Sequence, residues 1–175
     1  MPELKLTCGE KEYFCTSISV EQYRRYTEIM EKNESDDIRD AIEANVLILM
    51  DVFGARQQEI EEADVEEMLM AAKTIHFLMQ DVITMKFLEL NPERPEAVEQ
   101  EKSVFDDYDE ENGYNEIEAP TENLWKICRE NVDRIVKISI SLMKESYQNC
   151  MKSDIMSLLD HLKFEIQTAG ENERT

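Results

Sequence analysis

The cysteine, histidine and carboxylate side chains of this 175-residue chain are the groups that could do chemistry. The four cysteines and two histidines are far apart, and none shows the CxxC or HExxH spacing typical of metal sites. No Walker loop, dinucleotide-binding glycine motif or serine-nucleophile motif is present. We therefore expect no enzyme activity, cofactor or metal, a hydrogen-bonded core position for His76, and reduced thiols at Cys8, Cys15, Cys128 and Cys150.

One group of carboxylates approaches the spacing of a calcium-binding loop. Position 6 of such a loop needs glycine for its sharp turn, but here it is Asn112, and glycine follows one place later. Acidic segments produce this spacing by chance, so a calcium-responsive regulator is a lesser alternative. The carboxylates at loop positions 1, 3, 5 and 12 are Asp107, Asp109, Glu111 and Glu118.

The net charge of -21 is unevenly distributed along the chain. Residues 1–90 carry 20 acidic and 9 basic side chains, residues 91–120 carry 11 and 2, and residues 121–175 carry 9 and 8. Such dense like charge, with three of the four prolines, favours a solvated linker over residues 91–120. We expect an α-rich domain over 1–90, an acidic flexible linker over 91–120, and a C-terminal extension over 121–175.

The overall acidity also limits the partners. An acidic surface repels nucleic acid and anionic membranes, so we expect the chain to bind neither. No stretch approaches the roughly 20 apolar residues that cross a bilayer. The N-terminus, Met1-Pro2-Glu3-Leu4-Lys5, lacks the pattern of a secretion signal, which favours a cytoplasmic protein.

The N-terminal residues predict a β-hairpin followed by a helix. Apolar residues alternate on both sides of a turn at Cys8-Gly9-Glu10-Lys11, as in a short hairpin. Ser19 and Gln22 form a capping-box pattern at the start of the helix, which ends near Asn33-Glu34. The fold class is therefore mainly α with a small N-terminal β-hairpin, followed by a helical domain, the acidic linker and a C-terminal helical hairpin.

Two further helices are expected before the linker. Ser35 or Asp36 can cap the first, and Gly54 is the residue type that ends it. The second is predicted over residues 62–90 and is expected to be the longest helix.

The 62–90 segment is apolar nearly all round, so it is either central to the core or shared with a partner. One apolar group recurs every three or four residues and predicts the core side: Val65, Met68, Leu69, Ala72, Ile75, His76, Met79, Val82, Ile83 and Phe87. A second group lies away from it, and with one tryptophan it forms the candidate partner-binding set: Met70, Phe77, Leu78, Met85, Leu88 and Trp125.

Two amphipathic helices are expected after the linker. Thr121 can cap the first, which extends to Met143, and Ser153 can cap the second, which ends at Ala169-Gly170. Such a hairpin hardly makes a core by itself. We expect it to dock on the first domain, to dimerise, or to await a partner.

This layout resembles the tail assembly chaperones of long-tailed bacteriophages and prophages of Gram-positive bacteria. The residues that carry the resemblance are Glu3-Leu4-Lys5-Leu6, the tyrosine-rich helix Glu21-Gln22-Tyr23-Arg24-Arg25-Tyr26 and the helix end Asp51-Val52-Phe53-Gly54. The segment from Leu124 to Leu162 is similar to the extension of the longer family form, which arises by programmed ribosomal frameshifting. The resemblance implies residence in the host cytoplasm and absence from the mature virion.

The resemblance also implies the partners. The first domain would coat apolar helical stretches of the tape-measure protein, and the extension would recruit subunits of the major tail-tube protein. Self-association into a homo-oligomer is a further expected contact. The main alternative is an acidic inhibitor or decoy that captures a basic nucleic-acid-binding protein.

Overall fold

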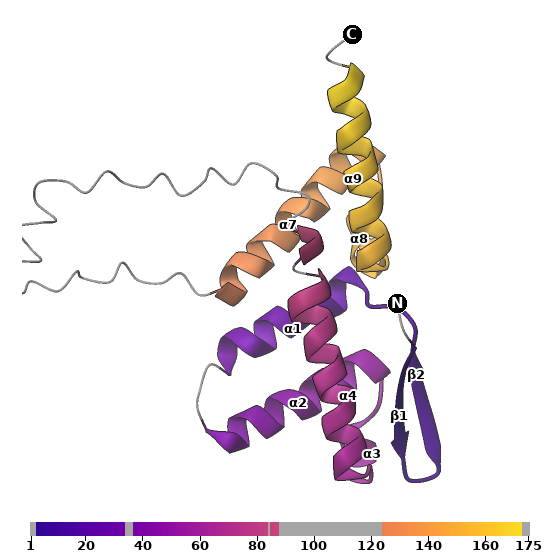
Figure 1. Ribbon diagram of the computed structural model, residues 1–175, viewed down its shortest axis with the longest axis vertical. Coiled ribbons are helices and arrows are strands. Elements are labelled where there is room, and N and C mark those ends of the chain that lie inside the picture. The colour runs from indigo at the N-terminus through magenta and orange to yellow at the C-terminus, as the bar shows by residue number, and fades with distance from the viewer. Residues whose placement is uncertain (1–2, 34–36, 84, 88–123, 173–175) are drawn as a thin grey trace, which may run out of the picture.

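The protein is mainly helical, with an N-terminal two-stranded hairpin, as the sequence predicts (Figure 1). The computed structural model describes residues 3–33, 37–83, 85–87 and 124–172. The acidic segment 91–120 and the calcium-like spacing within it lie outside these residues. Within the described residues, two antiparallel strands precede helices that pack around one apolar core.

The hairpin pairs β1 (Leu4–Cys8) with β2 (Lys11–Cys15). Its two-residue turn begins with Gly9, whose φ of 59° is a conformation that glycine adopts without steric cost. Alternate residues of β1 face the core, so that Leu4, Leu6 and Cys8 are buried. The hairpin therefore has one face on the core and one in solvent.

Helices α1 (Val20–Lys32) and α2 (Ile38–Phe53) begin at polar caps. The predicted capping box at α1 is confirmed: the Gln22 amide N–H donates to Ser19 Oγ over 3.1 Å, and the Ser19 N–H donates to Gln22 Oε1 over 2.9 Å. Asp37 caps α2, one residue after the predicted positions. Gly54 ends α2 with a φ of 65°, as expected.

The expected helix over residues 62–90 is divided. A short helix α3 (Gln57–Glu61), which the sequence did not predict, precedes α4 (Val65–Phe77), and α4 passes into a π-helical turn η1 (Leu78–Ile83). Apolar residues recur through the π-helical turn, where i→i+5 bonds replace the i→i+4 pattern, so periodicity did not reveal the change. Among the described residues, α4 has 13 residues and α7 has 20, and residues 84 and 88–90 of the expected helix lie outside the described part of the chain.

Helices α7 (Leu124–Met143), α8 (Tyr147–Lys152) and α9 (Ile155–Asn172) form the C-terminal part. With 20 residues, α7 is the longest described helix. The predicted hairpin thus contains an additional short helix, and Lys144, with a φ of 59°, lies between α7 and α8. Asp154, rather than the predicted Ser153, caps α9, because the Ser157 N–H donates to its carboxylate over 2.9 Å. Helix α9 continues past the predicted end at residues 169–170.

The C-terminal helices pack on the first part of the chain. Figure 1 shows α7 lying beside α1, and these two helices make the most extensive interhelical contact. Backbone hydrogen bonds reinforce the contact: the Val20 N–H donates to the Ser153 carbonyl over 3.0 Å, and the Ile155 N–H donates to the Ile18 carbonyl over 2.8 Å. We expected these helices to dock on the first domain, to dimerise or to await a partner. In the structure they are docked on the first domain.

Candidate interaction surface

Helix α4 faces the core through small and branched side chains. Ala71, Ala72 and Ile75 are buried, and Ile75 is fully inaccessible to solvent. The two alanines allow close approach of the neighbouring elements, which are α2 and β1. This side of α4 is a packing surface.

The opposite side of α4 carries large apolar side chains in solvent. Leu69, Met70 and Phe77 are 59%, 64% and 59% exposed, respectively. Leu69 and Phe77 are eight residues apart and Met70 and Phe77 are seven apart, so α-helical geometry places all three on one side of α4, with exposed Lys73 among them. We call Leu69, Met70 and Phe77 the α4 patch.

The candidate partner-binding residues are divided between surface and core. Met70, Phe77 and Met85 are exposed, Met85 by 58%. Leu78 is buried, with 4% exposure, and Trp125 is half-buried against the core. The remaining candidate, Leu88, lies outside the described residues.

Two predictions about which residues of the 62–90 segment face the core are wrong. Leu78 follows Ile75 by three residues, so α-helical spacing places both on the buried side. Val65 and Leu69, assigned to the core side, are 67% and 59% exposed because the buried side is centred on the alanines and Ile75. The sequence indicated two apolar sides, but it did not define their edges.

A partly buried polar network lies beside the core, at the C-terminal end of α4. His76 Nδ1 is 2.8 Å from the Tyr26 hydroxyl, and His76 Nε2 is 2.8 Å from Asn45 Oδ1. Asn45 Oδ1 can only accept a hydrogen bond, so Nε2–H donates to it. Nδ1 of the neutral imidazole then accepts a hydrogen bond from the Tyr26 hydroxyl. Burial lowers the pKa of His76 and raises that of Tyr26. The hydrogen bonds expected of His76 are present, and its side chain is partly buried beside the core.

Aromatic side chains extend this network from α4 to α7. Tyr26 meets Trp125 edge to face, with ring centroids 5.8 Å apart, and meets His76 at 5.6 Å. Tyr23 stacks on Phe87 at 5.6 Å. Trp125 therefore helps to hold α7 on α1, a structural role that its sequence position did not reveal.

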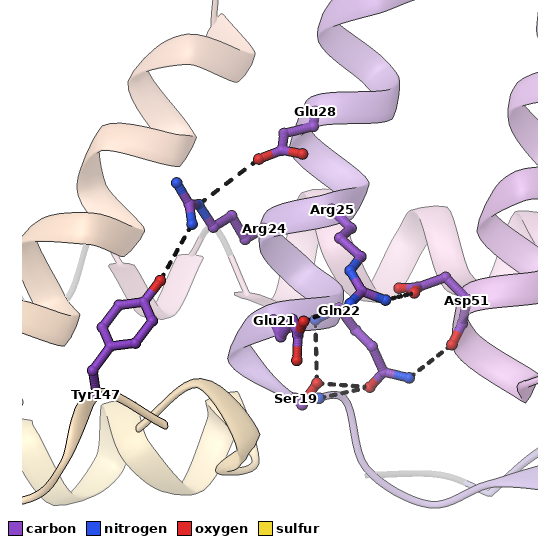
Figure 2. A network of polar contacts seen from close by, with 8 residues as sticks. All are labelled: Ser19, Glu21, Gln22, Arg24, Arg25, Glu28, Asp51 and Tyr147. Atoms are coloured by element: carbon purple, nitrogen blue, oxygen red, sulfur yellow. Dashed lines mark hydrogen bonds and ion pairs between the residues drawn. The ribbon is translucent and has the colours of Figure 1, made fainter. Parts of the chain in front are cut away.

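Charged side chains along α1 connect it with α2. Figure 2 shows Arg25 bonded to Asp51 over 2.6 Å and paired with Glu21. The side-chain amide of Gln22, the residue of the capping box, donates to the Asp51 carbonyl over 3.0 Å. One short stretch of α1 therefore both starts that helix and holds the end of α2.

Other polar contacts connect α1 with the C-terminal helices. Figure 2 shows Arg24 pointing at the Tyr147 hydroxyl, to which it donates over 3.4 Å. Its Nε also lies 3.4 Å from a carboxylate oxygen of Asp133 in α7. Arg129 of α7 pairs with Glu31 of α1. These contacts are partly exposed, so they orient the two parts more than they stabilise them.

No metal-binding or thiol chemistry is evident in the described part of the chain. No group of three or more histidine, cysteine or acidic side chains could hold a metal ion there. All four cysteines are unpaired and buried, and burial raises the pKa of each thiol. A raised pKa disfavours the reactive thiolate. None of the described helices is long and apolar enough to span a membrane.

Comparison of the chain with protein-family models, curated proteins and solved structures finds no match. The α4 patch exposes large apolar side chains, and the C-terminal helices also carry apolar residues that the sequence did not identify as exposed. These residues are Leu142, Tyr147 and Phe164.

Proposed function

We propose that this protein is a non-enzymatic assembly chaperone of a phage tail, which holds an apolar helical segment of the tape-measure protein on the α4 patch. The observation that carries the proposal is the exposure of Met70 and Phe77, by 64% and 59%, on the side of α4 that faces away from its core contacts. Large exposed apolar groups on a folded chain typically mark interaction sites. The charge of -21 would keep a loaded complex soluble.

The C-terminal helices would recruit the major tail-tube protein. Leu142 of α7 and Phe164 of α9 are 51% and 62% exposed, and they belong to a different part of the sequence from the α4 patch. Two separate apolar sites suit a chaperone that must hold one protein while it receives another. In this proposal the protein acts in the host cytoplasm and is absent from the finished tail.

Co-expression with an aggregation-prone tape-measure fragment tests the proposal. The wild-type chain should keep the fragment soluble, and the double variant Met70→Lys/Phe77→Lys should not, because lysine at both positions opposes apolar contact. The matched variant Leu142→Lys/Phe164→Lys should keep the fragment soluble but lose capture of purified tube protein. Equal fragment solubility with both variants would contradict the assignment of the α4 patch.

A further inference from the structure

The outer edge of β1 is open along part of its length. The described sheet has only two strands, so the side of β1 opposite β2 has no strand partner. The Thr7 N–H points away from β2 and donates to Glu67 of α4 over 3.2 Å. In an antiparallel strand, successive residues turn their backbone N–H and C=O groups alternately toward the paired strand and away from it. Lys5, two residues before Thr7, therefore also turns its N–H and C=O away from β2.

A groove runs between this edge and α4. It has a volume of about 640 Å³, and its lining includes residues of β1 and the side chains of Met70, Ala71 and Thr74 of α4. Figure 1 shows the hairpin beside α4, with β1 on the side nearer to the helix. Ala71 is small and Met70 is exposed, so an added strand has both room and an apolar surface below it. The end of β1 is closed, because Cys8 forms a bridge with Ala63.

The charges around the groove favour a basic occupant. Glu3, Glu66 and Glu67 line it, and neither Glu3 nor Glu66 forms a salt bridge with another described residue. The one basic side chain of the lining, Lys5, pairs with Glu12. Within the described residues, the groove therefore combines the outward backbone groups of Lys5, an apolar floor and two carboxylates without a salt bridge, Glu3 and Glu66.

We propose that the groove between β1 and α4 binds an extended, basic segment of a partner protein, which adds a third strand beside β1. Backbone hydrogen bonds to Lys5 fix the strand, as in other cases of strand addition to a sheet edge. Apolar side chains of the segment contact Met70 and Ala71, and its lysines or arginines reach Glu3 and Glu66. When the segment binds, the Glu67 carboxylate releases the Thr7 N–H and pairs with a basic side chain of the segment.

This site goes beyond the helical client of the α4 patch, because it requires an extended backbone and positive charge. The two sites share Met70 but differ at Phe77, which does not line the groove. A Phe77→Lys variant should therefore lose the helical client and keep the extended segment. The failure of one proposal can in this way be distinguished from the failure of the other.

The test uses a blocked heptapeptide of alternating lysine and valine and the full chain labelled with ¹⁵N. We expect saturable binding, with the largest amide shifts at Lys5 and Thr7 and slower hydrogen exchange at Lys5. A twin peptide in which proline replaces each valine keeps the charge but cannot form a regular strand. It should bind at least about tenfold more weakly.

Charge variants supply the second measurement. Glu3→Gln/Glu66→Gln should weaken the peptide about fivefold, which corresponds to the loss of two exposed ion pairs. Glu43→Gln/Glu130→Gln changes the net charge equally at exposed positions on other helices and should leave the affinity within about twofold. Equal binding of the two peptides, equal effects of the two charge variants, or amide shifts centred away from β1 and α4 would overturn the proposal.

Discussion

Helix α4 has two apolar sides that differ in what surrounds them. Ile75 is fully buried, whereas Phe77, two residues later, is 59% exposed. Both side chains are large and apolar, so composition does not separate them, but the energetic consequence of altering them should. The buried side should determine the stability of the fold, and in the proposed function the exposed side binds the client.

The largest expected effect is on the buried side. Ile75→Ala should lower the free energy of unfolding by about 2–5 kcal/mol, because it removes buried methyl groups and leaves a cavity. Phe77→Ala, on the exposed side, should change it by no more than about 0.5 kcal/mol. Urea denaturation followed by circular dichroism measures both. Similar losses in the two variants would remove the distinction between the sides.

The polar network behind α4 should give the next largest effect. Tyr26→Phe removes the hydroxyl that bonds His76, and leaving this partly buried nitrogen without its partner should lower the free energy of unfolding by about 1–3 kcal/mol. Tyr147→Phe removes a hydroxyl from a side chain that is half exposed, and should cost no more than about 0.5 kcal/mol. If the two tyrosine variants are equally stable in urea, the network does not contribute to the stability of the folded chain.

The pH dependence of stability isolates the histidine in that network. Burial lowers the pKa of His76 in the folded chain, so the unfolded chain binds more protons as the pH falls through the ordinary histidine pKa of 6.5. Stability due to the neutral imidazole is therefore present above that pH and is lost below it. The melting temperature should fall less between pH 7.5 and 5.5 in His76→Gln than in the wild type.

The smallest expected effect is at the charged contact between the two parts of the chain. Arg129 and Glu31 are both partly exposed, and such pairs contribute about 0–1 kcal/mol. A double-mutant cycle with Arg129→Met and Glu31→Gln should give a coupling energy within that range. A value well above it would mean that charge, rather than apolar and aromatic packing, holds α7 on α1.

Local signals made much of the fold predictable. The hairpin turn at Gly9, the capping box at Ser19 and the helix end at Gly54 depend on neighbouring residues, and the structure contains all three. The short helices α3 and α8 were missed because five or six residues show too little periodicity. The π-helical turn was missed because apolar residues continue to recur through it.

The surface was harder to predict than the core. Met70 and Phe77 were recognised as lying off the main apolar stripe, but Leu78 was misplaced and the exposure of Leu69 was missed. Trp125 faces Tyr26, a residue about 100 positions earlier, and no local pattern encodes such a contact. The edges of an apolar stripe depend on which other elements pack against the helix. The sequence of α4 alone does not encode these contacts.

The affinity of the full chain for a synthetic amphipathic helix from the tape-measure protein tests the central claim most directly. Isothermal titration should show saturable binding that Met70→Lys/Phe77→Lys weakens at least about tenfold, which corresponds to about 1.4 kcal/mol. The double variant should unfold at the wild-type urea concentration, and Leu142→Lys/Phe164→Lys should bind the helix normally. Unchanged affinity in a folded Met70→Lys/Phe77→Lys variant would contradict a client site on α4.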